Sequence, residues 1–101
     1  MEKLIGTPRD GSLLRFSLGL EYSRTNQRGK AIEQFRNSVA LDPGYSAAWR
    51  ALGKALESEG HAPEALEAYR SGIAAAKKKG DKQAEKEMTV FARRIEKKAA
   101  G

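Results

Sequence analysis

The chain has 101 residues, of which 32% are charged, and its formal net charge is +6. These proportions are typical of a folded domain with a modest core, and they argue against an intrinsically disordered chain. The sequence has no cysteine and a single histidine, His61, so it excludes disulfides, thiolate chemistry and a multi-histidine metal site.

Residues 1–11 are expected to form a flexible lead-in, because they show no helical period and contain two glycines and Pro8. Leu4 and Ile5 make too short an apolar stretch for a secretion signal. No apolar run elsewhere approaches the roughly 18 residues that a membrane span requires. We therefore expect a cytoplasmic protein without a membrane span.

Residues 12–45 have the pattern of two helices. Ser12 is a favourable N-cap residue, so we expect the first helix to begin there. Apolar residues alternate over residues 14–22, which favours a strand when this stretch is read alone. The segment 34 residues later is rich in Ala, Leu, Lys and Glu, so we interpret both segments as helices. The chain should break at residues 26–29, and the second helix should end at Leu41, because the residue before a proline avoids helical backbone angles.

Residues 46–79 contain the signals of a second pair of helices. Ser46 is a candidate N-cap residue. Gly60 suits the left-handed position that ends the first helix of this pair. Pro63 suits the first turn of the next helix, where a missing N–H costs no hydrogen bond. That helix should continue to about Lys79.

A fifth helix is expected within residues 80–101. Gly80 should end the preceding helix, and Asp81 should cap the new one. Apolar residues follow one face at spacings of three and four, namely Ala84, Met88, Phe91 and Ile95. An apolar stripe on an otherwise charged helix predicts a C-terminal helix that caps a stack of hairpins.

Positive charge is concentrated at this end, where residues 77–101 contain nine Lys or Arg against four Asp or Glu. The cations are Lys77, Lys78, Lys79, Lys82, Lys86, Arg93, Arg94, Lys97 and Lys98. Glutamates lie between them, as is typical of a solvated helix face, and we favour that interpretation. The alternative is a nucleic-acid-associated protein, or one that meets an anionic membrane surface, acting through the basic C-terminal helix.

The two helix pairs repeat each other. When the chain is shifted by 34 residues, small and large apolar residues coincide. The coinciding pairs include Leu18 with Leu52, Gly19 with Gly53, Ala31 with Ala65, and Phe35 with Tyr69. This period and register are typical of stacked helical hairpins and resemble the tetratricopeptide repeat (TPR) family. The resemblance implies an all-α fold, in which two stacked helix-turn-helix hairpins and a solvating helix form a fragment of a right-handed α-solenoid.

The resemblance covers residues 12–45 and 46–79, which match most positions of the family pattern. The first repeat matches at Leu18, Gly19, Tyr22, Ala31, Phe35 and Pro43, and the second at Trp49, Leu52, Gly53, Ala65 and Tyr69. The departures are Arg15 and Ser38 in the first repeat, and Leu56, Gly72 and Lys77 in the second. Lys77 replaces a proline, which implies that this helix runs longer. At these positions we interpret the aromatic residues as core, not as a platform for bases or sugars.

In this family the first helix of each repeat lines a groove that binds a partner. The matching positions here are Leu13, Phe16, Leu20 and Arg24 in the first repeat, and Arg50, Lys54 and Glu57 in the second. The family's clamp for a C-terminal carboxylate uses Lys and Asn in its first repeat. Phe16 and Leu20 occupy those places, so this clamp is absent in its usual form.

The resemblance therefore implies a non-catalytic protein-interaction module, such as a scaffold, an adaptor or a co-chaperone-like protein. No arrangement of residues indicates a catalytic, metal or cofactor site. The expected groove is apolar at the first repeat and basic at the second, and it suits a protein or peptide with apolar and acidic residues. A second copy of the protein is an alternative occupant of the apolar groove.

Overall fold

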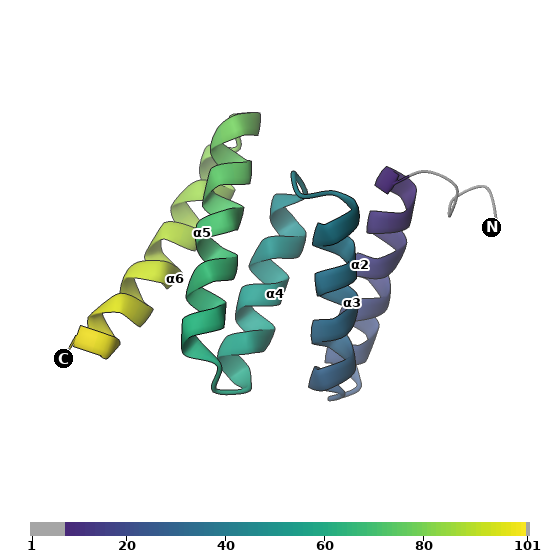
Figure 1. Ribbon diagram of the computed structural model, residues 1–101, viewed down its shortest axis with the longest axis horizontal. Coiled ribbons are helices and arrows are strands. Elements are labelled where there is room, and N and C mark those ends of the chain that lie inside the picture. The colour runs from purple at the N-terminus through teal and green to yellow at the C-terminus, as the bar shows by residue number, and fades with distance from the viewer. Residues whose placement is uncertain (1–7, 101) are drawn as a thin grey trace.

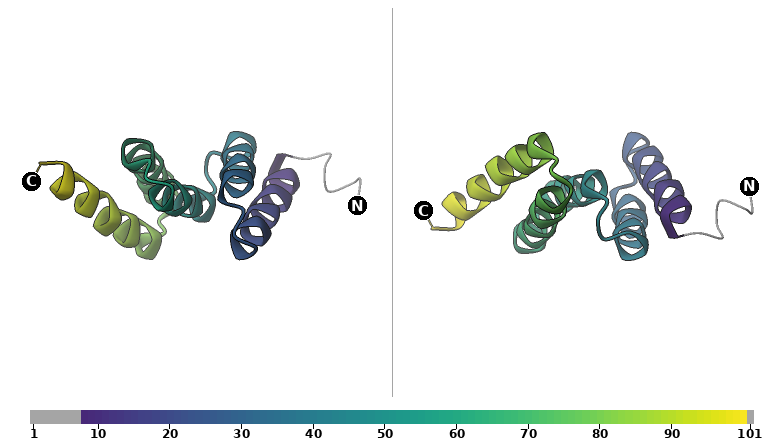
Figure 2. Two further views of the ribbon diagram at one scale, coloured as in Figure 1. Left: turned by 90° about the horizontal axis from the view of Figure 1, so that it is seen from below. Right: turned by 90° about the horizontal axis from the view of Figure 1, so that it is seen from above.

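The protein consists of two stacked helical hairpins followed by one further helix (Figure 1). The computed structural model describes residues 8–100, so the expected lead-in with Leu4 and Ile5 lies largely outside the described residues. The helices are α2 (Pro8–Arg24), α3 (Arg28–Leu41), α4 (Ser46–Ser58), α5 (Ala62–Lys79) and α6 (Lys82–Ala100). Helices α3 and α5 lie on one side of the stack, and α2, α4 and α6 lie on the other (Figure 2). The predicted all-α arrangement is confirmed.

The start of the first helix differs from the prediction. Helix α2 begins at Pro8, four residues before Ser12, in agreement with the preference of proline for a first helical turn. Ser12 is fully buried, and its hydroxyl donates to the Ser38 carbonyl oxygen at 2.8 Å, while the Ser38 hydroxyl donates to the Ser12 carbonyl oxygen at 2.8 Å. Ser12 therefore joins α2 to α3 and is not an N-cap. Ser46 is also not a cap, because it is the first residue of α4 and is buried.

The helix ends agree with the prediction. The chain leaves α2, α4 and α5 through residues with left-handed backbone angles, Asn26 (φ 63°), Gly60 (φ 81°) and Gly80 (φ 77°). Such residues allow the following N–H to bond back to the last helical turn, as His61 does to the Leu56 carbonyl oxygen at 2.9 Å. The Asp81 carboxylate then accepts the Ala84 N–H at 3.1 Å, which confirms Asp81 as the cap of α6.

Two glycines allow the helices of each hairpin to approach closely. A Cβ at Gly19 would overlap the ring of Phe35, and a Cβ at Gly53 would overlap the ring of Tyr69. Both rings are almost completely buried. The equivalent glycine–aromatic contact in each repeat confirms the register that the 34-residue shift predicted.

Helix α6 closes the second end of the stack. Met88 is fully buried, and Ala92 and Ile95 are nearly so, because this face of α6 packs against α5. Gly72 on α5 makes room for this contact, since a Cβ there would overlap the Met88 sulfur. An ion pair between Arg70 of α5 and Glu96 of α6, at 2.6 Å, also joins these two helices. None of the described helices combines the length and apolar composition needed to cross a membrane.

Candidate functional site

A hollow lies between the first helices of the two repeats, and we call it the α2–α4 groove. Its volume is about 300 Å³. It is lined by Leu20, Ser23, Arg28, Phe35, Ala51, Lys54, Ala55 and Ser58. Leu20, Phe35 and the two alanines make part of the lining apolar, while Arg28 and Lys54 add positive charge to it. Two of the expected groove residues, Leu20 and Lys54, therefore line a hollow together.

The leucines of α2 are the most open apolar groups in this region. Leu13 is 54% exposed and Leu20 is 47% exposed, although both are large aliphatic side chains. Large apolar side chains that remain exposed beside a hollow are a common feature of binding surfaces. Leu20 lines the α2–α4 groove, whereas Leu13 does not.

Phe16 was expected to be a groove residue, but it is partly buried and does not line the α2–α4 groove. Its ring centroid lies 5.0 Å from that of Tyr45 and 5.9 Å from that of Phe35, and the side chain is partly buried against the core. Tyr45 lies at the corner between α3 and α4, so Phe16 packs at the junction of the two repeats. The sequence pattern did not show this, because it placed no aromatic residue opposite Phe16.

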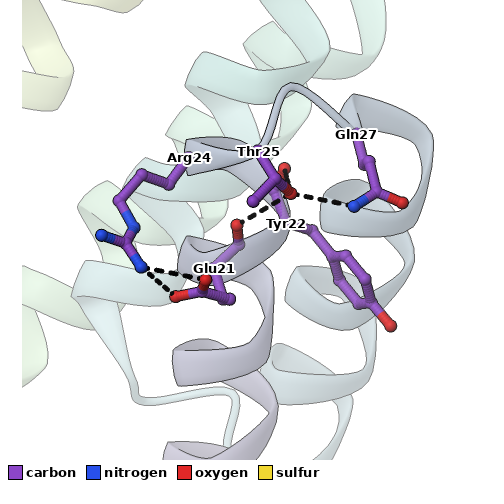
Figure 3. A network of polar contacts seen from close by, with 5 residues as sticks. All are labelled: Glu21, Tyr22, Arg24, Thr25 and Gln27. Atoms are coloured by element: carbon purple, nitrogen blue, oxygen red, sulfur yellow. Dashed lines mark hydrogen bonds and ion pairs between the residues drawn. The ribbon is translucent and has the colours of Figure 1, made fainter.

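Arg24 lies at the end of α2 and turns towards its own helix (Figure 3). Its Nη2 donates to both carboxylate oxygens of Glu21, at 2.7 and 2.9 Å. Nearby, the Thr25 hydroxyl accepts a hydrogen bond from the Gln27 amide at 2.9 Å. The pair of Arg24 and Glu21 is exposed, so it contributes little stability, but it partly neutralises the charge that Arg24 would offer a partner.

The two cations that were expected in the groove at the second repeat both contact side chains of α6. Arg50 donates to Glu87 of α6 at 2.6 Å. The Lys54 ammonium lies 5.0 Å from the centroid of the Phe91 ring, also on α6. Helix α6 runs beside α4 and provides partners for both cations. Lys54 also lines the α2–α4 groove, so it remains in contact with both surfaces.

Glu57 is likewise held by neighbouring side chains. Its Oε1 accepts the Tyr69 hydroxyl at 2.9 Å, and its Oε2 lies 3.8 Å from Arg94. Burial raises the pKa of the Tyr69 hydroxyl above its ordinary value, and the hydrogen bond and negative charge of Glu57 raise it further. Glu57 therefore fixes the packing of α4, α5 and α6, and its position in the sequence alone did not reveal this role.

Arg28 is a groove residue that the sequence analysis missed. It lies at the start of α3, outside the helices that the family pattern assigns to the groove, and it reaches the hollow because the α2–α3 turn is short. It forms an ion pair, at 3.5 Å, with Glu59, which directly follows α4 in the second repeat. Within residues 8–100, no cluster of His, Asp or Glu side chains has the arrangement of a metal site.

Comparison with known proteins gives the family. No family model matches the chain. A TPR repeat-containing protein of Pseudomonas aeruginosa is 44% identical over 96 residues, which cover 95% of this chain and 91% of that protein. A chloroplastic tetratricopeptide repeat domain-containing protein of Arabidopsis thaliana is 38% identical over 69 residues, which cover 68% of this chain and 23% of that protein.

Solved structures show the same architecture. A protein of Bordetella parapertussis superimposes with a TM-score of 0.76 and 43% identity, covering 88% of this chain and 77% of that one. A tetratricopeptide repeat domain protein of Salinibacter ruber superimposes with a TM-score of 0.79 and 25% identity, covering 84% and 86%. Together with the glycine–aromatic contacts that recur after 34 residues, these similarities show that the chain belongs to the tetratricopeptide repeat family.

Proposed function

We propose that the protein is a non-catalytic interaction module that binds a segment of a partner protein in the α2–α4 groove. The observation that carries the proposal is the coincidence of a hollow of about 300 Å³ with the exposed side chain of Leu20 on its rim. Membership of a repeat family supports a protein partner, since such stacks offer extended concave surfaces for binding. We also propose that the protein acts in the cytoplasm, as expected from the sequence.

The chemistry of the groove indicates what the partner carries. An apolar side chain inserted beside Leu20 would cover this leucine and the two alanines, and burial of one such side chain stabilises by about 1.5–3 kcal/mol. Acidic side chains next to it would meet Arg28 and Lys54 at the rim. Lys54 makes no ion pair with any described residue, so its charge is not already neutralised by a carboxylate. An extended or helical segment with apolar and acidic residues meets both requirements.

In this proposal the parts of the chain have different roles. Residues 12–45 and 46–79 form the binding module, and residues 80–101 cap it. The cap uses part of its charge internally, because Glu87, Arg94 and Glu96 of α6 pair with α4 and α5. The buried face of Met88, Ala92 and Ile95 supports the capping role of α6, whereas Arg94 is the one cation of residues 77–100 that pairs with a described residue of the repeats.

The test begins with selection of binding peptides from a random library displayed on phage. A selected peptide is then titrated against the parent, against Leu20→Glu and against the control Val90→Glu. Val90 is 59% exposed on α6, so this control adds the same charge to an exposed apolar site away from the groove. We expect Leu20→Glu to weaken binding by roughly tenfold or more, through lost apolar contact and repulsion of acidic groups.

Circular dichroism checks that both variants remain folded. A Leu20→Glu variant that is folded and binds as tightly as the parent would show that the selected peptide uses another surface. Equal weakening by Val90→Glu would show that the effect is one of net charge alone. Self-association of the parent without peptide, abolished by Leu20→Glu, would point to the second copy as the occupant.

A further inference from the structure

A larger hollow lies on the side of the stack formed by α3 and α5, and we call it the Trp49 pocket. Its volume is about 440 Å³, and it shares no residue with the α2–α4 groove. It is lined by Pro43, Gly44, Trp49, Ser71, Ala74, Ala75, Lys78 and Lys79. These residues come from the corner between α3 and α4, from α4, and from the last turns of α5; the corner and the end of α5 lie at the same end of the stack in Figure 1.

The side chain of Trp49 was expected to be a core residue, but it is only partly buried. Its indole N–H donates to the Pro43 carbonyl oxygen at 2.7 Å, which fixes the ring against the corner. Gly72 lies under its Cβ, where any side chain would overlap it. Because the indole N–H already has a partner, the ring offers the pocket apolar surface and no free donor. The alanines and Pro43 extend that apolar surface.

The far wall of the pocket is basic. Helix α5 continues past Lys77, where the family pattern has proline, and its last turn places Lys78 and Lys79 beside the pocket. Neither ammonium group forms an ion pair with a residue in the described range 8–100. The nearby carboxylate of Asp42 accepts the Gly44 N–H at 3.1 Å and so is held by its own turn. Two lysines therefore stand at the edge of an apolar hollow without a carboxylate partner.

We propose that the Trp49 pocket binds an extended protein segment in which an apolar side chain is followed by acidic side chains. The apolar side chain would lie against Trp49 and the alanines of α5, and the carboxylates would pair with Lys78 and Lys79. Charge complementarity selects this occupant, since the two cations lie together at one edge while the floor is apolar. The site is separate from the α2–α4 groove, so it gives the protein a second binding surface on the other side of the stack.

The composition of the pocket distinguishes this occupant from other anions. Single-stranded nucleic acid binds through successive aromatic faces on which its bases stack, and Trp49 is the only aromatic residue that lines the pocket. An inorganic anion would pair with the lysines but leave the indole and the alanines uncovered. A peptide with one apolar side chain and adjacent carboxylates uses both parts of the surface.

Trp49 is also the only tryptophan in the sequence, so it reports binding directly. The probe is the peptide acetyl-Asp-Leu-Asp-Asp-amide, whose capped ends ensure that every carboxylate comes from a side chain. It is titrated at about 0.15 M salt, where distant charges are screened. We expect a saturable change in the fluorescence of Trp49 and in the NMR resonance of its indole N–H. The peptides acetyl-Asp-Gly-Asp-Asp-amide and acetyl-Lys-Leu-Lys-Lys-amide should bind at least roughly tenfold more weakly.

Two variants locate the binding to the pocket. The double variant Lys78→Glu with Lys79→Glu should raise the Kd roughly tenfold or more. Its matched control is Lys97→Glu with Lys98→Glu. This control makes the same change of net charge in the last turn of α6, away from the pocket, and should leave the Kd nearly unchanged. The variant Ala74→Gln fills the pocket from an exposed helical position, and it should weaken binding without a change of charge.

Several results would overturn the proposal. These are a parent protein that shows no saturable change of the Trp49 signals, equal binding of the lysine and aspartate peptides, and equal effects of the two charge-reversal variants. Tighter binding of a short oligothymidylate than of the acidic peptide would assign the surface to nucleic acid instead. Because the readout is Trp49 and the α2–α4 groove is unchanged in these variants, failure here leaves the groove proposal standing, and the reverse also holds.

Discussion

The two repeats carry similar residues at equivalent positions, yet their burial differs. Leu52 in the second repeat is 2% exposed, whereas its equivalent in the first repeat, Leu18, is 36% exposed. Inside each hairpin the contacts are the same, since Gly19 meets Phe35 as Gly53 meets Tyr69. The difference arises because α4 has α3 beside it, whereas no described helix precedes α2. The repeat pattern thus determines the contacts within a hairpin, and the neighbouring elements determine how far its outer face is buried.

The largest expected effect tests this difference directly. Leu52→Ala removes a buried side chain and should lower the free energy of unfolding by about 2–5 kcal/mol. Leu18→Ala makes the same chemical change at a partly exposed site and should cost about half as much or less, because less apolar surface returns to water. Urea unfolding followed by circular dichroism measures both values. Equal losses would show that the outer face of the first repeat is as well covered as that of the second.

The next effect should be alike in the two repeats. Gly19→Ala and Gly53→Ala each place a methyl group against an aromatic ring, and each should cost about 1–3 kcal/mol through overpacking. The control is Gly29→Ala on α3, where no atom lies within 4 Å of the added Cβ. That change should stabilise the protein by up to about 1 kcal/mol, through helix propensity. Thermal melts that show a gain for all three variants would contradict the close approach of the helices.

The smallest effect concerns the hydroxyl group of Tyr69, which its equivalent in the first repeat lacks. Phe35 has no hydroxyl, whereas the Tyr69 hydroxyl donates to Glu57. Tyr69→Phe should cost about 0.5–1.5 kcal/mol at neutral pH, because this hydrogen bond is lost. This loss of stability is smaller than that of the other variants because phenylalanine keeps the buried aromatic ring.

The same variant should change the response to alkaline pH. The folded protein holds the Tyr69 proton more tightly than the unfolded chain does, because burial and Glu57 raise its pKa. As the pH rises above about 10, the unfolded chain loses this proton first, so the parent should lose stability there. Tyr69→Phe should lose less, and Tyr45, whose pKa is also raised by burial and by Asp42, contributes to the loss that remains. Unfolding curves at neutral and alkaline pH decide this, and identical losses in parent and variant would refute it.

Helix ends and the hairpin register could be predicted from the sequence because short-range chemistry sets them. Gly60, Gly80 and Asp81 act within a few residues of their own positions, and the 34-residue shift aligns each glycine with its aromatic partner. The start of α2 could not be predicted in the same way. A serine can cap a helix, and it can also make a close buried contact between two helices. Ser12 makes the buried contact because Ser38 lies opposite it in the hairpin.

The candidate site was harder to predict, because its character depends on pairs far apart in the sequence. Leu13 and Leu20 were found from their repeat positions, and both are exposed. The pairing of Arg50 with Glu87 joins residues 37 positions apart, and nothing in the repeat pattern aligns them. The contact of Arg50 with α6 was therefore not predicted from the sequence, and the partly exposed face of Trp49 was missed.

The ion pairs between α6 and the repeats have a consequence for how the cap is positioned. Exposed pairs of this kind add little stability. The buried face of α6 is made of Met88, Ala92 and Ile95, and Met88 fits over Gly72, so a shift by one helical turn, about 5.4 Å, would lose this contact. Such a shift would separate Glu87 from Arg50 and Glu96 from Arg70 at once. The charges therefore act together with the Met88–Gly72 contact, and both favour the same alignment of α6 on the repeats.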